Sequence, residues 1–245
     1  MKVAEQSLSK KSGKEAQKGA SSPAEKLESE TSSKGVRKEI IKKFPVRCNL
    51  EDYATTYNTF TWDQARSEIA YFHDGKVNAT YNAIDRHLNA GRKNKVALYS
   101  VDPTGHLEKY TYLEMYEAIN RMGNALKSLG IKKGDRVFVF LPRVKELYIA
   151  TLAIAKIGAI AGPLFSAFGP DALKDRLMDS EAKILITNPA LKDKIDGIRK
   201  ELSELEHVIV VGADKKSLRK GELSYEELVA SQSSELECER MDIED

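Results

Sequence analysis

The amino-acid sequence predicts an α/β domain with a mostly parallel sheet and flanking helices. Short apolar runs recur along the second half of the chain, helix-like segments separate them, and glycines follow several of these segments. Strands that alternate with helices are typical of a parallel sheet covered on both faces. The apolar runs are residues 136–141, 160–164, 183–187 and 207–211.

Composition divides the chain into three parts. Residues 1–45 contain eleven Lys and Arg against six Glu, although the net charge of the whole chain is only +2. Residues 1–38 have almost no large apolar side chain and cannot bury enough surface to offset the entropy lost on ordering. We therefore expect a disordered tail over residues 1–38, a helical segment over residues 39–94 and the α/β domain over residues 95–245.

Charge, hydropathy and cysteine content exclude several classes of protein. The small net charge disfavours a nucleic-acid partner, and no stretch approaches the ~20 apolar residues that a membrane helix needs. No apolar run follows the first lysines, so no secretory leader is expected. Cys48 and Cys238 are too isolated for a disulfide framework or a thiolate metal site. These features predict a soluble cytoplasmic protein that contacts neither nucleic acid nor membrane.

The segment before the α/β domain is expected to be mainly helical. Residues 51–60 have spaced aromatic side chains without a regular period, so we expect an irregular segment there. Thr61 and Gln64 fit a capping box at the start of a helix that extends to about Phe72. Residues 78–90 place apolar side chains on one stripe and predict a second helix.

Three consecutive polar residues in this second helix, Asp85, Arg86 and His87, could indicate acid–base chemistry. Adjacent residues on a helix do not face one another, however. We therefore interpret them as hydrogen-bonded or solvated groups.

A hairpin and a long helix open the α/β domain. Residues 95–101 and 107–110 predict two strands joined by a turn, and Thr111 with Glu114 forms a second capping box. A helix over residues 112–129 follows, and its methionines are expected to fill the core.

The central βαβ unit contains the expected site. Residues 136–141 predict a buried strand, residues 144–157 a nearly all-apolar helix and residues 160–164 a second strand. Lys145 and Lys156 are expected to share the one polar edge of this helix. Ligands of such sheets bind outside the carboxyl ends of strands, so the loop 165–169 is the place to expect a site.

The remaining elements continue the alternation. Pro170 starts a helix that extends to about Asp179, and Ser224 with Glu227 caps a last short helix. Between them we expect, in order, a strand at 183–187, a helix at 191–205, a strand at 207–211 and a charged loop at 212–221.

The familiar catalytic motifs are missing from the 245 residues. There is no GxGxxG, no GxxxxGK[ST] and no GxSxG, and the four histidines lack metal-ligand spacing. The residues alone predict an α/β domain with a strand-end pocket and no recognisable catalytic set.

Several blocks of the sequence resemble the N-terminal part of the AMP-forming acetyl-CoA synthetases, in the adenylate-forming superfamily. The blocks, in order, are VNATYNAIDRHL, KYTYLEM, GDRVFVFLPRVKELYIATLAIAKIGAIAGPLFSAF and DRLMDSEAKILIT. The resemblance covers about residues 49–245. It implies an incomplete N-terminal domain of the adenylate-forming fold, with residues 39–94 as an extension of acetyl-CoA-synthetase type.

The resemblance also implies an activity. Enzymes of this family join acetate to ATP, releasing diphosphate, and pass the acyl group of the adenylate to coenzyme A, with magnesium as cofactor. Their phosphate-binding loop and catalytic lysine lie beyond the region that matches these residues. We therefore expect an N-terminal fragment without catalytic or metal-binding residues, inactive alone, whose partner is the missing C-terminal portion of the enzyme.

The resemblance assigns cofactor-binding residues as well. Phe165, Ser166 and Ala167 occupy the loop that lines the coenzyme A entrance, where relatives often carry two glycines in place of Ser166 and Ala167. Lys192 and Lys194 are nearest to the basic positions that contact the nucleotide phosphate of coenzyme A. The alternative is that both lysines solvate the start of a helix.

A second class of function stays open. The chain could be a non-catalytic module that binds coenzyme A, or that self-associates through apolar surface which its missing portion would cover.

Overall fold

The computed structural model describes residues 50–245, so the tail expected over residues 1–38 lies outside the described residues. The chain divides into two compact units, Met1–Phe60 and Thr61–Asp245.

The described part of the first unit contains one short helix, α2 (Tyr53–Thr59). The side chain of Asp52 accepts a hydrogen bond from the backbone N–H of Thr55 at 3.0 Å and so caps the first turn. The expectation of an irregular segment over residues 51–60 is therefore wrong, because a local cap starts a helix that lacks an apolar stripe.

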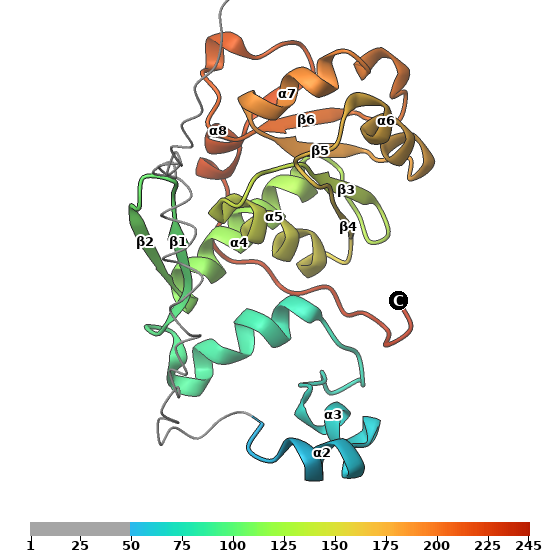
Figure 1. Ribbon diagram of the computed structural model, residues 1–245. Helices are drawn as coiled ribbons and strands as arrows, with labels where there is room; N and C mark the ends of the chain where they lie inside the picture. Colours follow the sequence, from blue (N-terminus) through green and yellow to red (C-terminus); the bar gives the residue numbers. More distant parts are fainter. Residues whose placement is uncertain (1–49) are drawn as a thin grey trace, which may run out of the picture. The chain divides into compact units, whose positions relative to one another are not determined.

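The second unit is built on a five-stranded sheet in which every pair of neighbouring strands is parallel (Figure 1). The strand order is β4-β3-β5-β6-β7. The strands are β3 (Arg136–Val139), β4 (Ile160–Pro163), β5 (Ile184–Thr187), β6 (His207–Val210) and β7 (Glu222–Ser224). The predicted α/β class is confirmed. Strand β7 was not predicted, because it is short and carries no apolar run.

Helices cover both faces of this sheet (Figure 1). The helices of the second unit are α3 (Trp62–Glu68), α4 (Tyr112–Ser128), α5 (Lys145–Lys156), α6 (Pro170–Asp179), α7 (Pro189–Asp196) and α8 (Tyr225–Ala230). Alternate side chains of β3 enter two different cores, as the pleat of a strand requires. Val137 and Val139 pack in the core formed with α4 and α5, whereas Phe138, and Phe140 directly after the strand, pack in the core formed with α6 and α7.

The helix starts agree with the predicted caps. Thr61 and Gln64 form a capping box at α3, and Thr111 and Glu114 form one at α4. Two helices are shorter than predicted. The backbone becomes extended at Ile69, which ends α3, and α7 stops at Asp196 before a separate turn of 3₁₀ helix, η3 (Arg199–Glu201).

Lys156 does not lie on a polar edge of α5 beside Lys145, as we expected. Its side chain is fully buried, and its ammonium group pairs with the carboxylate of Asp85 at 2.5 Å. The Lys156 ammonium also lies 4.6 Å from the centroid of the Tyr116 ring. Asp85 is therefore a hydrogen-bonded group, one of the two states that we expected for it.

Asp85 belongs to a helix with widened turns, η1 (Tyr81–Asp85), which is followed by η2 (Leu88–Arg92). These turns confirm a helical segment over the predicted residues 78–90. Gly91 has φ +74° and interrupts η2.

The predicted hairpin is an antiparallel pair, β1 (Val96–Val101) and β2 (Leu107–Thr111). The side chains of one face are exposed, namely Tyr99, Val101 and Leu107. Val101 and Leu107 are directly opposite in the register, so this face carries a short apolar strip.

The C-terminal segment, residues 232–245, runs in extended form between the helix that contains η1 and the pair α4 and α5 (Figure 1). The side chains of Asn120 and Asn124 donate hydrogen bonds to backbone carbonyls of this segment at 2.7 to 3.0 Å. Met241 pairs with Val77 through two backbone hydrogen bonds of 2.9 Å. None of the helices between residues 50 and 245 combines the length and apolar character that a membrane crossing requires.

Candidate functional site

The loop after β4 forms a tight turn at the carboxyl end of the sheet. The backbone N–H of Phe168 donates to the carbonyl of Phe165 at 2.9 Å, and the N–H of Leu164 donates to Val139 at 2.8 Å. Among the described non-glycine residues, only Glu181 has a positive φ. Ser166 and Ala167 therefore occupy this turn, here called the 165–168 turn, without needing the conformational freedom of glycine.

The two phenylalanines of the 165–168 turn differ in exposure. The side chain of Phe165 is 66% exposed, whereas Phe168 is partly buried against the core under α6 and α7. Their rings meet edge to face with centroids 5.9 Å apart. An aromatic side chain thus projects into solvent from the strand-end loop, while its neighbour anchors the loop.

Lys194 contacts the 165–168 turn from α7. Its ammonium group donates hydrogen bonds to the carbonyl oxygens of Ser166 and Phe168, each at 3.0 Å. The same group lies 5.8 Å from the centroid of the Phe140 ring. Asn188 positions α7, because its side chain caps the helix by accepting from the N–H of Leu191 at 3.0 Å.

Lys192 belongs to a different set of contacts. Its side chain is 11% exposed, and its ammonium group pairs with Asp196 at 3.0 Å and with Glu222 at 2.9 Å. Burial opposes the charge, but the hydrogen bonds with Glu222 and Asp196 outweigh burial and raise the pKa of Lys192. Among the described residues, the polar contacts of the Lys192 ammonium group join it to β7 and to its own helix, and none joins it to the 165–168 turn.

Arg176 is a further basic residue beside the 165–168 turn. Its guanidinium carbon lies 4.4 Å from the centroid of the Phe168 ring, within cation–π range. No motif marked this arginine in the sequence. Only the fold shows that the second turn of α6 lies against the loop that precedes the helix.

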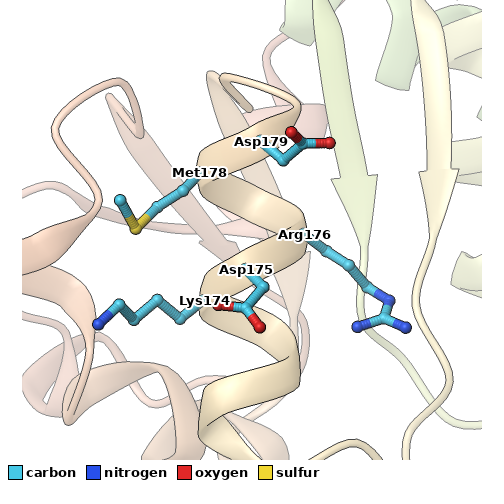
Figure 2. Close-up of a pocket in the computed structure, with 5 residues that line it drawn as sticks. All are labelled: Lys174, Asp175, Arg176, Met178 and Asp179. Carbon is cyan, nitrogen blue, oxygen red and sulfur yellow. The ribbon is translucent and has the colours of Figure 1, made fainter.

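Arg176 also lines an open hollow of about 690 Å³ along α6 (Figure 2). The lining residues are Lys174, Asp175, Arg176, Met178 and Asp179. Lys174 and Met178 extend to one side of α6 and Arg176 to the other, so these side chains do not converge on one point. Lys174 is paired with Glu201. We assign no ligand to this hollow, because a binding site needs convergent groups from more than one element.

The acidic, histidine and cysteine side chains of the described residues do not gather in metal-binding clusters of three or more. Residues 50–245 contain no group of three or more His, Cys, Asp and Glu side chains arranged to hold a metal ion. We therefore assign no residue of the range 50–245 as a ligand of the magnesium ion that the resemblance implies.

The chain matches a known family of enzymes. Residues 85–244 match the family model described as AMP-binding enzyme. The chain is 48% identical over 198 residues to an acetyl-coenzyme A synthetase of Bacillus subtilis, which covers 80% of this chain and 34% of that protein. It is 38% identical over 212 residues to an acetyl-coenzyme A synthetase of Methanothrix thermoacetophila, with 80% and 32% covered.

A solved structure agrees with these matches. The crystal structure of a Brucella canis acyl-CoA synthetase superposes with a TM-score of 0.68 at 33% identity, covering 76% of this chain and 33% of that one. The chain spans about a third of the length of the curated relatives that it matches. The family match, which includes the strands and helices around the 165–168 turn, shows that the chain belongs to the AMP-binding enzymes and is similar to their acetyl-coenzyme A synthetases.

Proposed function

We propose that the chain is the N-terminal part of an acetate–CoA ligase, which converts acetate, ATP and coenzyme A to acetyl-CoA, AMP and diphosphate. The observation that carries this proposal is 48% identity to an acetyl-coenzyme A synthetase over four-fifths of the chain. The parallel sheet, with a structured turn at its carboxyl end, agrees with a ligand site at that edge.

Within this enzyme, the chain contributes scaffold and one wall of the coenzyme A pocket. The 165–168 turn is the proposed wall, with the exposed ring of Phe165 and the backbone of Ser166 and Ala167 facing the ligand. Lys192 is held by two carboxylates, so we propose a structural role for it, in place of both the phosphate contact and the solvated helix start that we considered for it.

The chemical steps require groups that we do not find in these 245 residues. An acetate oxygen attacks the α-phosphorus of ATP and diphosphate leaves. The coenzyme A thiolate then attacks the acyl carbon and AMP leaves. Both steps need preorganised donors and cations around the transferred phosphoryl group. The resemblance places the phosphate-binding loop and the catalytic lysine of the family beyond the matching residues, and the chain spans about a third of its relatives. We therefore propose that the chain does not catalyse alone.

ATP–diphosphate exchange in the presence of acetate tests this proposal. The 245-residue chain is compared with a chimera in which it replaces the matching third of the Bacillus subtilis relative, and with that relative itself. We expect no exchange from the chain and measurable exchange from the chimera. Exchange by the chain would contradict inactivity, and a folded chimera without exchange would contradict the role as scaffold.

A second candidate is a module that self-associates, favoured by the exposed strip of Tyr99, Val101 and Leu107 on the hairpin. Exposed apolar side chains of this kind favour association between molecules. Sedimentation velocity of the chain and of Val101→Glu tests this candidate. A concentration-dependent dimer that the variant abolishes would support it, and a monomeric chain at all concentrations would exclude it.

A further inference from the structure

We propose that Lys194 is a positioning residue that holds the 165–168 turn through two backbone carbonyls, and that it is not a ligand for a phosphate group. The proposal rests on the proposed function only in taking this turn as the wall that faces coenzyme A.

The geometry at the ammonium group is the first support. A lysine ammonium has three N–H donors, and two of them are directed at the carbonyl oxygens of Ser166 and Phe168 at 3.0 Å. Hydrogen bonds from a charged donor are stronger than those from a neutral donor. Within residues 50–245, no carboxylate oxygen lies within ion-pair distance of this group. The charge of Lys194 is therefore in contact with two carbonyl oxygens and lies over the ring of Phe140.

Lys192 and Lys194 contact different parts of the fold. Residues two apart on a helix point to different sides. Lys192 is directed to Asp196 and Glu222, where it links α7 to β7, whereas Lys194 is directed to the loop after β4. Each lysine thus fastens α7 to a different edge of the sheet.

The 165–168 turn has few contacts of its own, so contacts from other elements are needed to hold its conformation. The turn is closed by one backbone hydrogen bond, and its central residues Ser166 and Ala167 are partly or fully exposed. Exposed turns with few contacts open readily. Lys194 holds the carbonyls of the turn and Arg176 stacks on the ring of Phe168, so contacts from α7 and α6 hold the turn.

Amide exchange of the free chain, resolved by NMR, tests this role without any ligand. The probe is the N–H of Phe168, which closes the turn. Lys194→Met removes the donors while keeping the length of the side chain, and we expect this amide to exchange about tenfold faster than in the parent chain. Lys194→Arg keeps charge and donors and is expected to restore most of the protection. Lys200→Met, which removes an exposed lysine, is the matched control and should leave the rate unchanged.

Two results would overturn the proposal. One is an unchanged Phe168 exchange rate in a folded Lys194→Met variant. The other is equal acceleration in Lys194→Met and Lys194→Arg, which would show that charge and donors are irrelevant. If Lys194→Met does not fold, Lys194→Gln, which keeps an N–H donor without the charge, takes its place with an expected intermediate rate.

A calorimetric titration of the same variants with coenzyme A separates this proposal from the proposed function. A positioning role predicts weaker binding together with faster exchange in the free chain. A phosphate contact predicts weaker binding with unchanged exchange and would overturn the positioning role. Absence of coenzyme A binding by the parent chain would count against the pocket wall, while the exchange rates would still decide the role of Lys194.

Discussion

At the residue scale, the most consequential contact is the buried pair of Lys156 and Asp85. The side chains are 0% and 12% exposed, and they come from positions 71 residues apart in the chain. Burying an ammonium group is unfavourable unless an opposite charge and hydrogen bonds compensate it. The carboxylate of Asp85 and the face of Tyr116 supply that compensation. The pair therefore fixes the η1 helix against α5.

Removal of one partner should be strongly destabilising. We expect Asp85→Asn to lower the free energy of unfolding by about 3–5 kcal/mol, because it leaves the Lys156 charge buried without its counter-ion. Urea denaturation measures this change. The double variant Asp85→Leu with Lys156→Met should recover most of the loss, since two apolar side chains replace both charges. A single variant as stable as the parent would contradict the importance of the pair.

Cys238, which contacts Asp85, makes the stability of the fold depend on pH. Its thiol lies 3.4 Å from the Asp85 carboxylate, and burial, helped by that carboxylate, raises the pKa of Cys238 to about 12 from its ordinary 9.0. Between these pH values the unfolded chain loses the thiol proton and the folded chain keeps it. The stability contributed by the thiol is therefore complete below pH 9 and decreases as the pH rises towards 12.

The measurement compares urea unfolding of the parent chain and of Cys238→Ser at about pH 8 and about pH 10.5. Lysines and tyrosines titrate in both proteins, so the difference between the two losses of unfolding free energy comes from the thiol. We expect the parent chain to lose more stability than Cys238→Ser over this interval. Equal losses would show that Cys238 titrates normally.

At the element scale, the packing of β4 beside β3 requires a glycine at position 162. Gly162 pairs with Phe138 of β3 in the parallel register, and the Phe138 ring covers the position where a side chain would begin. A Cβ at residue 162 would lie 2.5 to 2.6 Å from atoms of that ring. Such a distance requires the ring to move.

Gly162→Ala is therefore expected to destabilise the chain by about 1–3 kcal/mol through overpacking. Gly197→Ala is the control, because its Cβ would meet nothing within 4 Å and its φ is −66°; we expect no loss of stability. Thermal or urea unfolding measures both. Adding Phe138→Leu to Gly162→Ala should relieve the overpacking, and a tolerated Gly162→Ala alone would contradict this account.

At the scale of the whole second unit, the C-terminal segment connects parts that are distant in sequence. It accepts hydrogen bonds from α4, donates one from Glu239 to Lys156 at 2.8 Å and pairs with Val77. The amide of the buried Asn78 joins these parts, because it donates to Glu239 at 2.9 Å and to Lys156 at 3.1 Å. Removal of the segment would leave the buried side-chain amide of Asn120 without its acceptor, the carbonyl of Ser234, and would take from Asn78 one of its acceptors.

Deletion of residues 232–245 should lower the free energy of unfolding by about 3 kcal/mol or more, since each unsatisfied buried group contributes about 1–3 kcal/mol. The matched control deletes only residues 243–245, which lose a partly exposed ion pair with Lys133 and should change stability by less than about 1 kcal/mol. Urea denaturation of the two deletions measures the difference. Equal effects would show that residues 232–242 are not an integral part of the fold.

Much of the architecture could be predicted from local patterns. The apolar runs identified four strands, and the boxes at Thr61 and Thr111 identified two helix starts, because burial on both faces and capping leave local signals. An apolar pattern is absent from β7, which is only three residues long, and from α2, which has a capping residue but no buried side chain. The position of the 165–168 turn followed from the order of strands and helices. Which lysine contacts the turn could not be predicted, because nothing in the sequence distinguishes Lys192 from Lys194.

The sequence by itself determined the α/β class, the family resemblance and the location of a loop at a strand end, because these depend on short-range periodicity and on ordered motifs. Only the tertiary structure decided that Lys156 is buried against Asp85, that Lys192 binds carboxylates and that Lys194 holds a turn. The physical reason is that the environment of a charge depends on groups distant in sequence, which meet only when the sheet and its helices have packed.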